Sequence, residues 1–175
     1  MSSPSIATAL KFTLKEEGGF VDNPHDHGGA TNHGITQATY DTWRDRHTLP
    51  RRSVESIADA EVRGIYDEMY WTPGHCAALS AALAVAHFDW CVNHGCTGAV
   101  MTLQQVLGIK ADGNFGPLTR AALAAKDHGE LWQSYNDLRR GWYRDRAAAH
   151  PDQAVFLKGW LARVGRLDSY LATLA

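Results

Sequence analysis

The sequence predicts a mainly α-helical protein with one small β-hairpin or irregular lobe after the first helix. Apolar residues recur at three- and four-residue spacing through most of the chain, as they do on the buried face of amphipathic helices. Segment 18–36 interrupts this pattern with glycine, asparagine and aspartate, which are typical of turns. A length of 175 residues, 45% of them hydrophobic, fits one globular domain or one domain in two tightly packed lobes.

The first predicted helix covers residues 5–17. Its apolar face includes Ile6 and Leu10, spaced four residues apart. Ser5 is a suitable N-cap and Gly18 a suitable stop, so we expect the two consecutive glutamates of the sequence "KEEGG" to lie in the last turn.

The hairpin is predicted from the turn residues that follow. Gly28 and Gly29 form a strong turn signal, and short β-like stretches flank them at residues 20–21 and 34–36. We therefore expect segment 18–36 to fold back over the end of the first helix.

Nearly all of the remaining chain is predicted to be helical, with stops at proline and glycine. Pro73 ends one helix, and Pro117 begins another at its first position. A weak boundary at residues 93–96 divides the chain into a lobe at 5–92 and a helical half at 93–173, and it is too short for a flexible linker. The predicted helices lie at about residues 36–46, 59–71, 80–92, 97–107, 117–125, 129–149 and 153–173.

The composition excludes several classes of protein. With 17 basic and 19 acidic residues the net charge is -2, so nucleic acid is not an expected partner. No run of residues approaches the apolar length of a membrane span, roughly 18 residues. The three cysteines, Cys76, Cys91 and Cys96, have no zinc-binding spacing and are interpreted as small buried thiols.

Glu17 is the strongest candidate for chemistry. At a helix C-terminus the backbone carbonyls point their negative ends at it, and Glu16 adds a second negative charge. Both effects favour a protonated carboxyl group, which is what a general acid needs. Asp26 and Thr31 follow beyond a bend, and a hairpin can bring both back over the helix end. Two carboxylates and a hydroxyl that orients water fit the logic of glycoside hydrolysis.

Three histidines near Asp26 offer a rival reading. His25, His27 and His33 could bind zinc, but a loop HxH without a defined third ligand is a weak signal. The sequence is equally compatible with a polar loop surface, and we expect no metal and no cofactor.

Several segments match a known family. "EGGFVDNPHDHGGATNHGIT", "IYDEMYW" and "HFDWCVNHG" resemble motifs of glycoside hydrolase family 108. "LQQVLGIKADGNFGPLT" and "FLKGWLARV" resemble the predicted peptidoglycan-binding half that accompanies it. The resemblance spans nearly the whole chain, and members include phage endolysins and related bacterial cell-wall hydrolases.

The resemblance implies a lysozyme-like, mostly α-helical fold and an N-acetylmuramidase that cleaves peptidoglycan. It implies that Glu17 is the general acid, with Asp26 and Thr31 as helpers. The second half would either bind peptidoglycan independently or, as we favour, supply the other wall of one cleft. Candidates to line the sugar groove are Asn93, Trp71, Tyr70 and Trp90.

Two other functions remain open from the sequence. One is a non-catalytic wall-binding or structural protein, and the other, less favoured, is a metal-dependent wall peptidase. The expected partner is the glycan strand of peptidoglycan, and the chain is expected to be a monomer. Residues 1–19 lack the basic region and apolar core of a signal peptide. We therefore expect synthesis in the cytoplasm and action on the cell wall after holin-type release or dedicated export.

Overall fold

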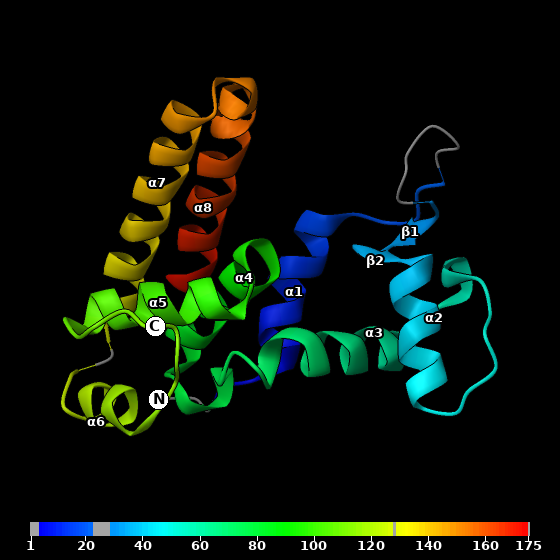
Figure 1. The fold of residues 1–175 in the computed structure, drawn as a ribbon, viewed down its shortest axis with the longest axis horizontal. Helices are drawn as coiled ribbons and strands as arrows, with labels where there is room; N and C mark the ends of the chain where they lie inside the picture. The colour runs from blue at the N-terminus through cyan, green and yellow to red at the C-terminus, as the bar shows by residue number, and fades with distance from the viewer. Residues whose placement is uncertain (1–3, 23–28, 128, 175) are drawn as a thin grey trace.

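The computed structural model describes residues 4–22, 29–127 and 129–174. It is mainly α-helical with a single two-stranded sheet among these residues, which confirms the predicted fold class (Figure 1). The strands are β1 (Thr31–Asn32) and β2 (Ile35–Thr36). The α-helices are α1 (Ile6–Glu17), α2 (Gln37–Arg46), α3 (Asp59–Tyr66), α4 (Ala81–His94), α5 (Cys96–Leu107), α6 (Pro117–Ala124), α7 (Leu131–Ala149) and α8 (Leu157–Leu171).

Helix α4 forms the centre of the fold. Every residue from 82 to 91 is buried, because this helix is apolar on nearly all sides and α1, α5, α7 and α8 pack around it. The two polar exceptions, His87 and Asp89, are fully buried as well. A buried charge needs partners, so Asp89 marks a place where the core contains more than hydrophobic packing.

The ends of the helices follow the predicted signals. Ser5 is the N-cap of α1, and Gly18 ends it with a φ of 83°, its N–H donating to the Leu14 carbonyl at 3.3 Å. Pro117 begins α6 at the first helical position.

Two predicted helices differ in their turns. The predicted helix at 59–71 is α-helical only to Tyr66, and it continues as a π-helix over Asp67–Trp71. Thr72 closes that wider turn, because its N–H donates to the Asp67 carbonyl at 2.9 Å and its hydroxyl to the Asp67 carboxylate at 2.7 Å. Near the C-terminus, Pro151–Phe156 is a 3-10 helix, so the last α-helix begins at Leu157 rather than near residue 153.

A hairpin forms between α1 and α2, but among the described residues its turn lies at His33–Gly34, whereas the prediction placed it at Gly28–Gly29. Thr31 pairs with Thr36 and Asn32 with Ile35, and the turn residues His33 and Gly34 have φ angles of 51° and 73°. Positive φ at both positions is the geometry of a tight hairpin turn. The side-chain amide of Asn32 donates at 3.2 Å to the carbonyls of Val54 and Glu55, which anchors the hairpin to the 3-10 helix Val54–Ser56.

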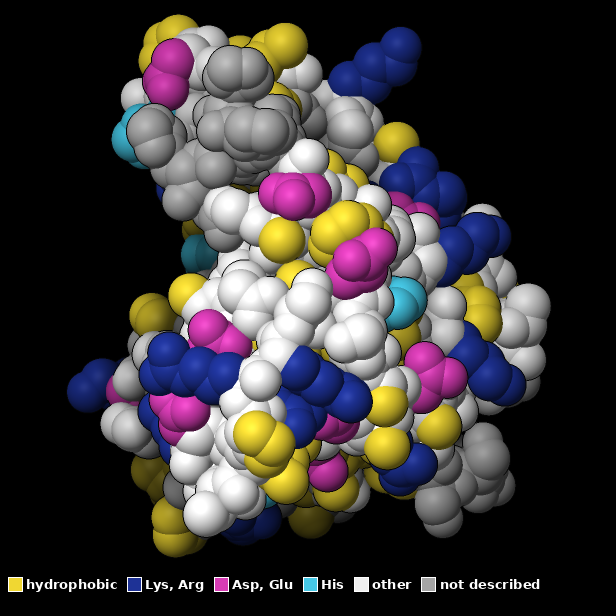
Figure 2. Space-filling model, turned by 90° about the vertical axis from the view of Figure 1, so that its right-hand side faces the viewer, with side chains coloured by type: hydrophobic (Ala, Val, Ile, Leu, Met, Phe, Trp, Pro, Cys, Tyr) yellow, Lys and Arg dark blue, Asp and Glu magenta, His cyan; other side chains and the backbone are white. Residues whose placement is uncertain are grey.

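Helices α7 and α8 form an antiparallel pair that stands on the opposite side of α4 from the hairpin (Figure 1). Viewed from the side of the hairpin and α2, basic and acidic side chains alternate over the surface without a large region of one sign (Figure 2). Among the described residues, no helix is long and apolar enough to cross a membrane.

Candidate active site

Glu17 is the last residue of α1, and its side chain lies under the turn of the hairpin. It is 24% exposed, so it is accessible from solvent but held on several sides. A Cβ atom placed on Gly34 would lie 3.2 Å from Oε2 of Glu17 and 2.9 Å from Oη of Tyr66. The hairpin therefore folds back over the end of α1, as the sequence predicts, and glycine is what lets it approach so closely.

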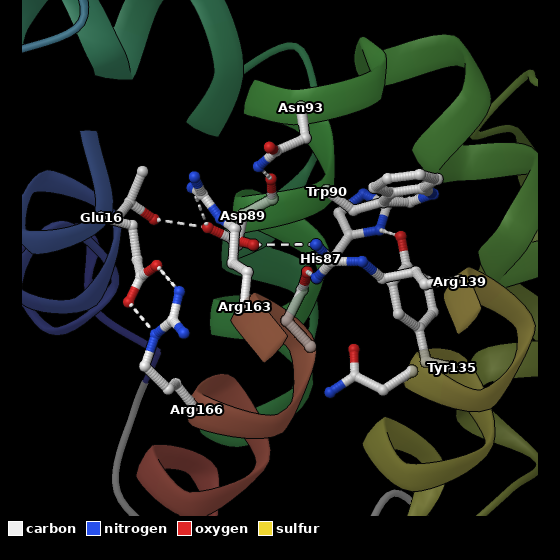
Figure 3. Close-up of polar contacts among 12 residues, drawn as sticks. Glu16, His87, Asp89, Trp90, Asn93, Tyr135, Arg139, Arg163 and Arg166 are labelled. Atoms are coloured by element: carbon white, nitrogen blue, oxygen red, sulfur yellow. Dashed lines mark hydrogen bonds and ion pairs between the residues drawn. The ribbon is translucent and has the colours of Figure 1, made fainter. Parts of the chain in front are cut away.

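An arginine from the last helix contacts this glutamate. Nη2 of Arg163, on α8, lies 2.8 Å from Oε1 of Glu17 and also 2.8 Å from Oδ1 of Asp89. Residues 146 positions apart in the sequence thus meet at one guanidinium group. Figure 3 shows Arg163 beside Asp89, with α1 on one side and the aromatic and arginine side chains of α4 and α7 on the other.

Asp89 is the buried centre of this cluster. Its carboxylate accepts hydrogen bonds from Nη2 of Arg139 at 2.9 Å, from Arg163, and from the hydroxyl of Thr13 at 3.2 Å. Burial alone would raise the pKa of Asp89, but the charges of Arg139 and Arg163 hold it below its ordinary value. Burial likewise opposes the charged form of Arg163, and the two carboxylates nevertheless raise its pKa.

Glu16 belongs to a separate ion pair, in which the arginine is exposed but the glutamate side chain is only 10% exposed. Its carboxylate accepts two hydrogen bonds from Arg166, at 2.8 and 2.6 Å (Figure 3). The hydrogen bond from Arg166 lowers the pKa of Glu16. Each of the consecutive glutamates therefore has its own arginine from α8.

Two tyrosines of the α3 segment lie close to Glu17. The hydroxyl of Tyr66 donates to the His33 carbonyl at 2.8 Å, which ties the hairpin turn to α3. Burial and then the charge of Glu17 raise the pKa of Tyr66. Burial, followed by Cys96 and Glu17, raises the pKa of Tyr70, whose ring lies 5.6 Å from that of Tyr66. Both remain neutral hydroxyl donors at neutral pH.

The remaining predicted helpers are only partly described. Asp26, His25 and His27 lie outside the described residues. Thr31 stands at the start of β1, where its hydroxyl lies 3.4 Å from the Gly29 carbonyl. His33 forms the hairpin turn.

The four predicted groove residues separate in the structure. Asn93 is exposed at the end of α4, and its amide donates to the Asp89 carbonyl at 2.6 Å. Tyr70 is half-buried near Glu17. Trp90 is only 1% exposed, because α4 is covered on that side. Trp71 is 8% exposed and packs on Phe88, and its remaining surface lines a pocket of about 250 Å³ with Thr72 and His75.

A buried group of thiols and an imidazole is the one candidate metal site among the described residues. Donor atoms of Cys76, His87 and Cys91 lie within 4.8 Å of one another. However, both ring nitrogens of His87 already have partners at 2.9 Å, the Gly74 carbonyl and the Tyr135 hydroxyl. Burial lowers the pKa of His87 to about 4, so the ring is a neutral core group.

Comparisons with known proteins place this chain in a family. Residues 10–95 match the family model described as Glycosyl hydrolase 108, and residues 98–165 match one described as Predicted Peptidoglycan domain. The solved structure of Brucella abortus SagA is 32% identical in sequence, with a TM-score of 0.76 over 96% of this chain and 94% of that chain. The chain belongs to glycoside hydrolase family 108. A comparison with curated proteins finds no match.

Membership of family 108 makes this chain a glycoside hydrolase that acts on peptidoglycan. The two matched segments meet at the candidate site, since Glu17 belongs to the first and Arg163 to the second. Sequence reasoning missed Arg163, Asp89 and Tyr66. The signal was present, because Asp89 lies in "HFDW" and Arg163 in "FLKGWLARV", both of which resemble family motifs.

Replacing Gly34 with alanine is expected to slow hydrolysis and to destabilise the fold by about 1–3 kcal/mol. The added methyl group would contact Tyr66 and Glu17 in a backbone conformation with φ of +73°. Gly29→Ala is the matched control, because it has a φ of +65° but no atom within 4 Å of the added carbon. The hydrolysis rate of each variant is measured on purified peptidoglycan, and its stability is measured by urea unfolding. Equal rates in the two variants would contradict contact with Glu17 as the cause.

Proposed function

We propose that this family 108 chain is a lysozyme-type N-acetylmuramidase that cleaves the β-1,4 bond between N-acetylmuramic acid and N-acetylglucosamine. Glu17 is the general acid that protonates the glycosidic oxygen. The observation that carries the proposal is the position of Glu17, partly exposed at a helix end and held between the hairpin turn and Arg163. A carboxyl group in this position can reach solvent and substrate while its orientation stays defined.

The charges around Glu17 balance one another. Arg139 pairs with Asp89, and Arg163 pairs with both Asp89 and Glu17. The two positive charges therefore equal the two negative charges once Glu17 has lost its proton. When Glu17 carries the proton, Arg163 keeps Asp89 as its partner, and no buried carboxylate is left unpaired. Arg163 therefore stabilises the carboxylate that remains after the proton has moved to the leaving group.

Asp26 and Thr31 complete the proposal as helpers. A second carboxylate can position water or stabilise positive charge on the sugar ring, and a hydroxyl can orient that water. Thr31 is close in sequence to the hairpin turn that covers Glu17, which supports its role.

Arg163→Gln is expected to lower kcat on peptidoglycan by about 10–100-fold, because Glu17 loses the group that orients it. The alkaline limb of the pH–rate profile, where a general acid loses its proton, is expected to move, which a purely structural role would not cause. Arg166→Gln is the matched control, since Arg166 lies on the same helix and pairs with Glu16 instead. An unchanged pH profile in Arg163→Gln would contradict the positioning role.

Mass spectrometry of digested peptidoglycan tests the function itself. A muramidase leaves N-acetylmuramic acid at the new reducing end, and we expect that product. Products ending in N-acetylglucosamine would indicate a different glycosidase. Protein that sediments with cell walls but releases no reducing ends would support the non-catalytic alternative.

We also propose that the enzyme acts on the cell wall after leaving the cytoplasm, by holin-type release or dedicated export. In that setting hydrolysis would lyse or remodel a bacterial cell wall. Fractionation of producing cells, with muramidase activity assayed in each fraction, tests this location.

A further inference from the structure

A second feature of the structure lies next to the Glu17 cluster and has no role in the proposed proton transfer. It is a pocket of about 310 Å³ where the end of α4 meets α7 and α8. We call it the aromatic pocket. Its lining residues are Asn93, His94, Trp142, Tyr143, Arg146 and Trp160.

The aromatic walls of this pocket hold one another in place. The ring of His94 stacks on buried Trp90 at 4.4 Å and meets Trp142 edge-on at 4.2 Å. Trp160 stacks on Tyr143 at 5.1 Å. A Cβ on Gly98 would lie 2.3 Å from the His94 ring, so glycine there makes room for it. Trp90, predicted to line a groove, instead supports a residue that does.

The pocket also carries a positive charge. Nε of Arg146 donates to the side-chain oxygen of Gln153 at 2.8 Å, and its guanidinium lies 5.3 Å from the centre of the Trp142 ring. Among the described residues no carboxylate forms an ion pair with Arg146. Burial, and then Arg146 and Arg139, lower the pKa of His94, so Arg146 is the charged side chain of this pocket at neutral pH.

Asn93 links the aromatic pocket to the Glu17 cluster. It lines the pocket and donates to the Asp89 carbonyl, one helical turn earlier on α4. The side chain of Asp89 in turn binds Arg163, which contacts Glu17. The pocket and the Glu17 cluster therefore share the C-terminal turn of α4.

We propose that the aromatic pocket is a subsite for the carboxylate-bearing N-acetylhexosamine of the glycan strand. Half-buried Trp142 and Trp160 contact the apolar face of the sugar ring, and Arg146 pairs with the carboxylate of its lactyl or stem-peptide substituent. Aromatic rings that are apolar on one side and polar at the edge suit a sugar, and a preformed pocket binds it with little loss of entropy. The proposal rests on the proposed muramidase function and adds the means by which the enzyme distinguishes peptidoglycan from a neutral polymer.

Two soluble probes test the subsite in a Glu17→Gln background, where the sugars stay intact. One is the disaccharide of N-acetylglucosamine and N-acetylmuramic acid, which has a free lactyl carboxylate, and the other is the neutral N-acetylglucosamine dimer. We expect tighter binding of the first in calorimetry. Adding Arg146→Gln is expected to weaken that binding by about tenfold, the size of one partly exposed charge-assisted hydrogen bond, and to leave the neutral dimer unaffected.

Trp142→Ala in the same background is expected to weaken the binding of both sugars by about tenfold.

The matched control for Arg146→Gln is Arg46→Gln, because Arg46 lies beside Trp43 in a pocket of similar size elsewhere on the protein. Circular dichroism checks that each variant is folded.

The subsite proposal would be overturned if the protein with Arg146→Gln still preferred the acidic disaccharide. It would also be overturned if the protein with Arg146 intact bound the two sugars equally. These results are independent of the muramidase assignment, which fails only if the wild-type enzyme releases no muramic acid ends from peptidoglycan.

Discussion

Glu17→Gln is expected to lower the rate of peptidoglycan hydrolysis by about 10²–10⁴-fold while the protein stays folded. Glutamine keeps the shape of the side chain and can still accept a hydrogen bond from Arg163, but it has no proton to donate to the glycosidic oxygen. Release of reducing ends from purified peptidoglycan measures the rate. Sedimentation with cell walls should be unchanged, because binding does not need the proton.

Glu16→Gln provides the control for that result. Glu16 is adjacent in the sequence and also contacts an arginine of α8, but its partner is Arg166 rather than Arg163. We expect this variant to hydrolyse peptidoglycan within about twofold of the wild-type rate, because it leaves the Glu17 carboxyl group and its contact with Arg163 in place. A Glu17→Gln enzyme that is as active as Glu16→Gln would refute Glu17 as the general acid.

Asp89→Asn is expected to be the most destabilising single change, costing about 3–5 kcal/mol. The change leaves Arg139, which is fully buried, without a counter-charge, and it also removes the carboxylate that holds Arg163. Urea unfolding followed by tryptophan fluorescence measures the loss. Asp45→Asn removes an exposed carboxylate paired with Arg51, and it should leave the urea midpoint unchanged. A similar midpoint in both variants would contradict the central place of Asp89.

The same carboxylate predicts a dependence of stability on pH. The folded-state pKa of Asp89 is held below its ordinary value of 3.8, so the unfolded chain takes up a proton first as the pH falls. The contribution of Asp89 is therefore complete above about pH 4 to 5 and is lost as the pH falls through the folded-state pKa. Asp89→Asn should show a shallower loss of stability below pH 4 than the wild type, which urea midpoints between pH 2 and 6 would measure.

Local features of the fold follow from the sequence because their causes are local. The spacing of Ile6 and Leu10, the cap at Ser5 and the stop at Gly18 define α1 without reference to the rest of the chain. The same holds for Pro117 at the start of α6. Segment 59–71 was predicted as one α-helix, but its last turn is a π-helix. That wider turn depends on the hydrogen bond from the Thr72 N–H to the Asp67 carbonyl.

The position of Glu17 at the end of α1 was predictable for the same reason, whereas its environment was not. A glutamate in the last turn of a helix, followed by a glycine-rich fold-back, is visible in the sequence around Glu17. The expected repulsion between Glu16 and Glu17 is replaced by two separate ion pairs with α8. Those partners lie about 150 residues away, and no local pattern links them.

The fold class, the extent of α1 and the fold-back of the chain over its end follow from the sequence, because helix periodicity, caps and turns act within a few residues. Three other features depend on tertiary packing: α8 supplies Arg163 to Glu17, Asp89 holds two arginines in the core, and Trp90 supports the aromatic pocket from behind. Burial and charge pairing depend on which distant helices pack together. That packing is a property of the whole core around α4 rather than of any one segment.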